Sequence, residues 1–270
     1  MPSADIWDPA TYLRWTKPRT RGVTDLISQI DHAGPRRITD LGCGPGNNTE
    51  LIADRWPRAM VTGIDSSPRM IDSARSRQRP GQLEFRVGDL RDWVPDEPPD
   101  VVLANAVLQF IPGHLELLRR WAGFLAPGGM LGVQLPGSPP AQGRDSIMEI
   151  ARELIETPAW RDQLSGSLEN VHVYPPEDYL TALGDEGMDA EAWESVYSFP
   201  LAGPGSLAEY AAGAMIRPAL SRLDGEDRER FLAEYAAALR ERQPPVLIGG
   251  QPVEILRQRR VFGLGRRRLL

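Results

Sequence analysis

Residues 40–46, with the sequence DLGCGPG, combine one carboxylate with three glycines at alternate positions. Gly42, Gly44 and Gly46 can adopt positive φ and carry no Cβ, so a ligand can approach the backbone closely. A helix that begins after them would attract negative charge. The spacing differs from the G-x-G-x-x-G of dinucleotide sites, and Asp40 would repel a pyrophosphate but accept a hydrogen bond from an ammonium group. The segment predicts a loop that binds a ligand with a carboxylate or phosphate and an ammonium group.

Polar side chains end the following expected strands as well. Asp65 lies where doubly wound nucleotide sites use an acid to bind both ribose hydroxyls, and we assign Asp65 and Ser66 to that role; a helix N-cap is the alternative. Asp89 can accept from an exocyclic adenine amine while Leu90 offers its backbone N–H; an exposed turn is the alternative. Asn105 ends the fourth strand, so four strand ends converge on one crevice.

The elements that position these residues alternate between strand and helix. Short apolar runs predict five strands, at Arg36–Leu41, Met60–Ile64, Leu83–Val87, Asp100–Ala104 and Met130–Gln134. Helical spacing predicts helices between them, at Asn48–Trp56 with an asparagine N-cap, Pro68–Arg77 and Leu115–Phe124. Because such strands are nearly continuous in apolar residues, we expect a parallel sheet that is covered on both faces and doubly wound.

After Pro136 the pattern changes to a proline-punctuated, mostly helical region. Two later strands, Ala192–Phe199 and Ile255–Leu264, are expected to close the sheet as an antiparallel pair, with helices Ser206–Ala214 and Glu226–Arg242 between them. The predicted fold is therefore α/β, a doubly wound, mostly parallel seven-stranded sheet with a helical cap inserted after the fifth strand. Its single domain, 1–270, divides into an N-terminal lid and first helix (1–34), a cofactor-binding core (35–137), cap segments (138–185 and 204–245) and closing strands (190–200 and 253–265).

Composition narrows the class of partner. The formal net charge of −6 gives no general attraction for nucleic acid or anionic membranes, and neither is expected as a partner. One cysteine, Cys43, permits no intrachain disulfide and no thiolate zinc site, and no metal is expected. The sequence shows neither a signal peptide nor 18 consecutive apolar residues, which predicts a cytoplasmic protein. The basic run at 257–268 is expected to be a solvated strand edge or tail.

These motifs have a family resemblance. DLGCGPG, GIDSSPRM, GDLRDW and ANAVLQFIPGH resemble the class I methyltransferases, and WDPATYL, LLRRWAGFLAPGG, QLPG, AWESVY, GAMIRP and FLAEYAAALRE are similar to the trans-aconitate 2-methyltransferase family in particular. The resemblance implies S-adenosylmethionine as the cofactor and S-adenosylhomocysteine as its product. It places Gly42, Gly44 and Gly46 along the methionine moiety, Asp65 at the ribose and Asp89 at the adenine. It also implies a small-molecule acid as the substrate; the oligomeric state is left open.

Residues for the acceptor follow from the chemistry of that reaction. A carboxylate is already ionised and needs no general base, but its companion carboxylates need cations, for which we propose Arg21 and Arg217. Tyr12 and Trp15 precede the sheet and are expected in a lid over the site. A hydroxyl or amine acceptor from a natural-product pathway would need a base, and His114 is the candidate, with a surface-loop histidine as the alternative.

Departures from the family pattern concern the acceptor side of the site. Ser138–Gln142 replaces a different stretch, Phe110 and Tyr210 stand where the family commonly has tryptophan, and Val253–Leu256 replaces an apolar lead into the last strand. These differences predict a changed acceptor pocket. A non-catalytic binder of the cofactor is the remaining alternative, because a fold and a cofactor site do not guarantee transfer.

Overall fold

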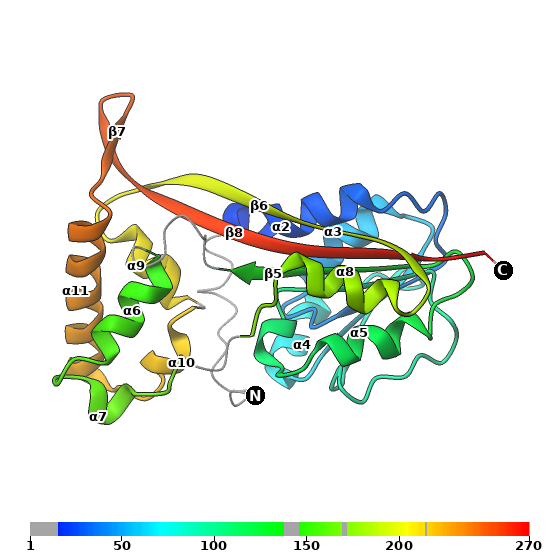
Figure 1. Cartoon of the computed structure of the whole chain (residues 1–270), viewed down its shortest axis with the longest axis horizontal. Coiled ribbons are helices and arrows are strands. Elements are labelled where there is room, and N and C mark those ends of the chain that lie inside the picture. The colour runs from blue at the N-terminus through cyan, green and yellow to red at the C-terminus, as the bar shows by residue number, and fades with distance from the viewer. Residues whose placement is uncertain (1–15, 138–145, 169–171, 214, 270) are drawn as a thin grey trace.

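The computed structural model describes residues 16–137, 146–168, 172–213 and 215–269 (Figure 1). Tyr12, Trp15 and the segment Ser138–Gln142 lie outside these described residues. Among the described residues, the helices fall short of the length and apolar character needed to cross a membrane. The same part of the chain contains no cluster of three or more histidine, cysteine, aspartate or glutamate side chains that could hold a metal ion.

One mixed sheet runs through the molecule in the order β3-β2-β1-β4-β5-β8-β6, with β7 paired to β8. Its strands are β1 Arg37–Leu41, β2 Met60–Asp65, β3 Leu83–Val87, β4 Val101–Asn105, β5 Met130–Gly137, β6 Met188–Ala202, β7 Val246–Ile248 and β8 Gln251–Arg267. The first five pair in parallel and β8 is antiparallel to both of its long neighbours. This confirms the predicted doubly wound fold, with one correction: the sheet has eight strands, because β7 and the start of β8 form a short hairpin.

Helices cover both faces of the parallel strands, as their nearly continuous burial requires. α2 (Thr16–Gln29), α3 (Asn47–Arg55) and α4 (Pro68–Ala74) pack on one face, around Leu26, Ile52 and Ile71. α5 (Leu115–Ala122) and α8 (Pro176–Gly184) pack on the other, around Trp121 and Tyr179. α8 was expected in the cap; it lies on the sheet instead because its buried residues face β8 and α5.

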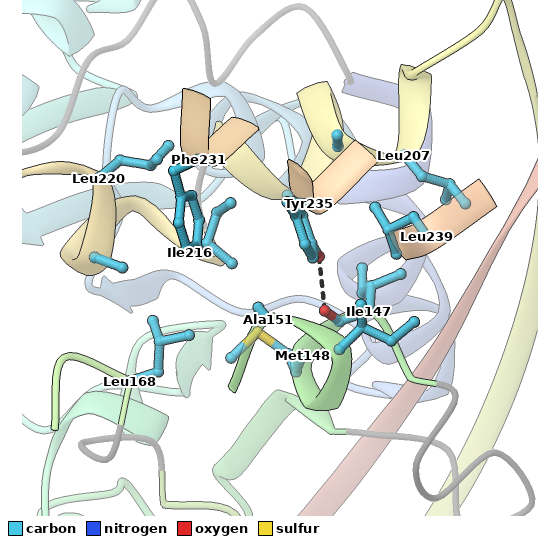
Figure 2. Close-up of a cluster of buried hydrophobic side chains, with 14 of the residues drawn as sticks. Ile147, Met148, Ala151, Leu168, Leu207, Ile216, Leu220, Phe231, Tyr235 and Leu239 are labelled. Carbon is cyan, nitrogen blue, oxygen red and sulfur yellow. Dashed lines mark hydrogen bonds between the residues drawn. The ribbon is translucent and has the colours of Figure 1, made fainter. Parts of the chain in front are cut away.

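A separate hydrophobic core lies at one end of the sheet (Figure 1). It is built by α6 (Ile147–Ile155), α7 (Arg161–Leu164), α9 (Ser206–Ala212), α10 (Arg217–Leu220) and α11 (Gly225–Arg242), which we call the cap. Figure 2 shows Tyr235 and Leu239 of α11 facing Ile147 of α6, while Phe231 lies beside Ile216. The Tyr235 hydroxyl donates to the Ile147 carbonyl at 2.6 Å, which satisfies a buried phenol.

The two closing strands reach from the sheet to the cap, and both are longer than predicted (Figure 1). The basic run was expected at an edge or tail, and this is wrong: β8 lies between β5 and β6. Arg260 is consequently 7% exposed. The boundaries between lid, core and cap stay predictions.

Two helix starts show how local geometry decides a cap. The expected asparagine cap of α3 is wrong, because Gly46 takes the cap position at φ 82° without a side-chain hydrogen bond. At α4, Ser67 accepts from the backbone N–H of Met70 at 3.4 Å, which is ordinary serine capping.

Candidate active site

A pocket lies at the carboxyl ends of the parallel strands, where doubly wound folds bind ligands. Six predicted site residues line it: Gly42, Gly44, Asp65, Ser66, Leu90 and Asn105. Three others, Asp40, Gly46 and Asp89, do not contribute to its walls. Apolar residues that the sequence did not single out for the cofactor complete the pocket, among them Ile64, Met70 and Val107.

The three positions in the loop require glycine for different physical reasons. All adopt positive φ, at 78°, 55° and 82°. A Cβ on Gly42 would lie 2.4 Å from Val107 and one on Gly46 would lie 2.7 Å from the Phe85 ring, so both glycines are required by packing within the protein. A Cβ on Gly44 would meet nothing within 4 Å. Gly44 is therefore the glycine that leaves its backbone open towards a ligand.

Asp65 ties the glycine loop to the end of β2. Its two carboxylate oxygens accept from the backbone N–H groups of Gly44 and Ser67, each at 2.9 Å. Burial raises the pKa of Asp65, and these two N–H donors oppose that shift. Because each carboxylate oxygen has a second lone pair, Asp65 can still accept from a ligand's hydroxyl groups.

Asp40 lies beneath the loop and is 1% exposed. One carboxylate oxygen accepts from the Thr49 hydroxyl of α3 at 2.7 Å. Burial raises the pKa of Asp40 to about 6, with a smaller contribution from the negative charge of Asp65. A buried acid of this kind is stabilised in its charged form by a cation bound above it.

Asp89 is held by its own neighbour. Arg91 donates to both carboxylate oxygens through its side chain, and its backbone N–H donates to one of them at 2.9 Å. These hydrogen bonds lower the pKa of Asp89. The flanking residues Gly88 and Leu90 line the pocket, whereas the Asp89 carboxylate is held by Arg91, and the role of this turn at the adenine stays a prediction.

The end of β4 carries both a free polar atom and backbone strain. Asn105 is 7% exposed and its Oδ1 has no hydrogen-bond partner. Ala106 adopts φ 53°, an uncommon conformation for a residue with a Cβ. The Gln134 carbonyl accepts from its N–H, and its carbonyl accepts from the Gln109 side chain, both at 2.8 Å. Strain of this kind is concentrated at functional sites.

His114 is fully buried and does not face solvent. Its Nδ1–H donates to the Ile111 carbonyl at 3.1 Å, and its Nε2 accepts from the Tyr179 hydroxyl at 2.9 Å. The ring stacks on Tyr179 and meets Tyr174 edge to face. Burial lowers the pKa of His114. The buried ring contradicts the alternative of a surface-loop histidine. Because both nitrogens have partners within the protein and His114 does not line the pocket, we propose a packing role for it in place of the expected general base.

The two predicted acceptor-binding arginines are not brought together. Arg21 on α2 pairs with Asp25 at 3.0 Å and stacks over Tyr197, and its side chain is 55% exposed. Arg217 begins α10 within the cap and is half-buried. Neither lines the pocket.

Comparison with known proteins agrees with the fold. A family model described as "Methyltransferase domain" matches residues 38–129. The YcgJ protein from Bacillus subtilis has a solved structure that covers 92% of this chain and 98% of its own, with a TM-score of 0.59 and 16% identity. Fold, glycine loop and family match together define an S-adenosylmethionine-dependent methyltransferase.

Curated relatives give the narrower family. Trans-aconitate 2-methyltransferase of Streptomyces coelicolor is 43% identical and covers 98% of this chain and 88% of its own. The Streptomyces avermitilis protein of the same name is 41% identical, over 90% of this chain and 92% of its own. The chain belongs to the trans-aconitate 2-methyltransferase family.

The cofactor is S-adenosylmethionine, and the chemistry of the pocket fits it. Gly44 leaves an open approach to the backbone, Asp65 has spare lone pairs, and Asn105 holds an unpartnered acceptor. Ile64, Met70 and Leu90 supply apolar walls of the kind that a purine ring requires.

Proposed function

We propose that this protein transfers a methyl group to one carboxylate of trans-aconitate and forms a monomethyl ester. The relatives named above support the acceptor. The observation that carries the proposal is the chemistry of the pocket wall, whose titratable side chains are Cys43 and Asp65. Asp65 is already held by two N–H donors, and burial raises the pKa of the Cys43 thiol. Among the described residues the pocket wall therefore offers no ready base, which suits an acceptor that is ionised before it binds.

The cofactor roles follow from the positions of the side chains. Asp65 and Ser66 would hold the ribose, Gly88 and Leu90 would face the adenine, and the Gly44 backbone would hold the methionine end. Asp89 lies between Gly88 and Leu90, and its predicted bond to the adenine amine would use a carboxylate that Arg91 already holds. Asp40 would act from below through its charge, without contact. These assignments keep the sequence predictions and narrow them, because Gly42 and Gly46 serve packing first.

The chain supplies orientation and exclusion of water. When bound, S-adenosylmethionine supplies the methyl group, which a carboxylate oxygen takes as the carbon–sulfur bond breaks, leaving a neutral ester and a neutral thioether. No proton has to move. Holding the carboxylate in line at close approach can supply much of the rate, since well-oriented reactions gain about 7–11 kcal/mol from proximity. Asn105, Val107 and Phe110 line the same pocket, and we propose that they face the acceptor.

The test is a product analysis. Purified protein is incubated with S-adenosylmethionine and trans-aconitate, and mass spectrometry looks for an acid in which one proton is replaced by methyl. Propane-1,2,3-tricarboxylate serves as a matched acceptor that keeps the three carboxylates without the double bond. An ester of trans-aconitate supports the proposal. Binding of S-adenosylhomocysteine without any ester would contradict it and favour another acceptor, a hydroxyl or amine among them, or a non-catalytic binder.

Three expectations about location and binding partners remain predictions. The protein is expected in the cytoplasm, its partner is expected to be a small-molecule acid, and it is expected to bind neither nucleic acid nor membranes.

A further inference from the structure

Three adjacent strands bring polar side chains to one face at the carboxyl edge of the sheet. Asn105 of β4 is in register with Gln134 of β5, and Gln134 is opposite Phe262 of β8. Arg260 lies two residues from Phe262 along β8, opposite Pro136. Residues two apart on a strand share a face, so the three polar side chains form a row. The row continues the face on which Leu103, Met130 and Phe262 pack with α2.

Each member of this row has a buried polar atom without a hydrogen-bond partner. The atoms are Asn105 Oδ1, Gln134 Nε2 and Arg260 Nε. The exposed fractions of the residues are 7%, 1% and 7%. Buried polar groups are normally satisfied, so three unpartnered atoms on neighbouring strands make this row a candidate contact for a bound polar group. Asn105 already lines the cofactor pocket, so the row leads away from that pocket towards the cap.

Arg260 is the most unusual member. Its Nη2 donates to Gln258 Oε1 at 3.1 Å, and no carboxylate among the described residues pairs with it. Its neighbours on the same strand are paired: Arg259 with Glu194 and Arg266 with Asp31. A buried cation without a counter-ion is costly, because desolvation is not offset by Coulomb attraction. The position is therefore built for an anion.

The cap orients this guanidinium. Gln258 Nε2 donates to the Tyr210 hydroxyl of α9 while Gln258 Oε1 accepts from Arg260. Tyr210 is one of the departures from the family pattern, and its hydroxyl accepts the hydrogen bond that orients Gln258. With Nη2 held in this way, Nε is left without a partner, as is Nε2 of Gln134 on the adjacent strand.

We propose that Arg260 and Gln134 bind a carboxylate of the acceptor that does not itself react. The proposal rests on the proposed function and names the specificity determinant of the same site. Diagonal neighbours on adjacent strands have side-chain origins about 7 Å apart, a separation that one carboxylate bound by both Nε and Nε2 can span. The reacting carboxylate loses its charge on transfer, so an arginine bound to it would stabilise the ground state more than the transition state. A companion carboxylate keeps its charge throughout and is the one that an arginine can bind without cost in rate.

The test uses Arg260→Met, which keeps most of the apolar stem and removes the charge, with Arg260→Lys as the conservative variant. The exposed arginine three residues earlier gives a matched control, Arg257→Met. Three quantities are measured: turnover of trans-aconitate, equilibrium binding of trans-aconitate to the complex with S-adenosylhomocysteine, and the melting temperature without acceptor.

We expect Arg260→Met to raise KM for trans-aconitate by at least about 30-fold, the usual loss when one partner of a buried charge pair is removed. Binding of S-adenosylhomocysteine stays unchanged, and the melting temperature stays equal or rises, because an uncompensated charge has gone. Arg260→Lys recovers part of the loss, since lysine keeps the charge but not the fork. Arg257→Met behaves as wild type.

The outcomes separate the two proposals. Wild-type turnover with normal KM in Arg260→Met, or a fall in melting temperature that accounts for the lost activity, overturns the role of Arg260 and leaves the function standing. Arg260-dependent binding of trans-aconitate without turnover overturns the function and leaves the anion site standing. Wild-type protein that neither binds nor methylates trans-aconitate overturns both.

Discussion

The two ends of the site are built in contrasting ways. The cofactor end is assembled from strand ends that follow one another closely in the chain, between Asp40 and Phe110, so each side chain arrives with its own strand and turn. The acceptor end is assembled by β8, which pairs with β5 and β6 and reaches the cap. Local sequence specifies the first end, and long-range register specifies the second.

The largest expected effect sharpens this contrast within the glycine loop itself. Gly42→Ala meets Val107 at 2.4 Å and adds a Cβ at positive φ, whereas Gly44→Ala adds only the second penalty. We expect Gly42→Ala to lower the free energy of unfolding by about 4 kcal/mol, the sum of overpacking and backbone strain. Gly44→Ala should lose about 1 kcal/mol but weaken S-adenosylhomocysteine binding. Chemical denaturation measures the stability of both alanine variants, and calorimetric titration measures their affinity for S-adenosylhomocysteine. Equal stabilities of the two variants would contradict the packing role of Gly42.

The parts that the sequence predicted share one property. Asp65 and Asn105 are the last residues of apolar strands and the glycine loop follows one directly, so the parallel sheet places them without knowledge of any distant residue. The residues that were missed depend on pairing across the chain. Gln134 reads as an ordinary strand residue, and only its register opposite Phe262 shows that it adjoins Arg260.

His114 shows the same limitation in reverse. Its position after the fourth strand suggested a base, and nothing nearby in the sequence announces that Tyr179, 65 residues further along, occupies its Nε2. Arg260 was taken as part of a solvated run because adjacent arginines look alike in sequence. Side chains alternate along a strand, so Arg259 and Arg260 point to opposite faces of the sheet. Arg259 pairs with Glu194, whereas Arg260 is buried without a counter-ion.

The second prediction tests whether β8 also holds the cap in place. Glu254 is 5% exposed and accepts from the backbone N–H groups of Gly205 and Leu207, each at 2.8 Å, and from the Ser206 hydroxyl at 3.0 Å. Glu254 of β8 therefore accepts from the N-terminal backbone of α9 and serves as its cap. Glu254→Ala should lower the free energy of unfolding by about 3 kcal/mol, since buried donors lose a charged acceptor.

Glu254→Gln keeps the shape and one good acceptor, so it should lose less than the alanine variant. Thermal unfolding measures the stability of both variants, and S-adenosylhomocysteine affinity is expected to stay constant because Glu254 does not line the cofactor pocket. A parallel loss of cofactor affinity would break the proposed separation between the two ends.

The third prediction concerns His114. His114→Ala should cost about 2 kcal/mol of stability, because the Tyr179 hydroxyl loses its acceptor and a cavity forms. Tyr179→Phe is the matched variant, and kcat of the folded fraction should be unchanged in both. Because the pKa of His114 is lowered in the folded state, its contribution is complete above the unfolded pKa near 6.5 and is lost as pH falls. A folded, cofactor-binding His114→Ala protein with no turnover would restore the general base.

The smallest expected effect reports on Asp40, which influences the cofactor end without lining it. Its pKa of about 6 in the ligand-free protein lies above that of an unfolded aspartate, so protonation stabilises the fold. The free energy of unfolding therefore loses this contribution as pH rises from about 4 through 6. A bound ammonium or sulfonium has the opposite preference, because it stabilises the charged carboxylate.

Affinity for S-adenosylmethionine should consequently fall about tenfold between pH 7 and pH 5, as Asp40 takes up a proton that binding must displace. Asp40→Asn should remove this dependence and bind with similar affinity at both values. Calorimetric titration in buffers of different ionisation enthalpy also counts the released proton directly. An unchanged pH profile in Asp40→Asn would mean that the titrating group is Asp65, whose pKa burial also raises, and that the buried acid serves only to anchor Thr49 and α3.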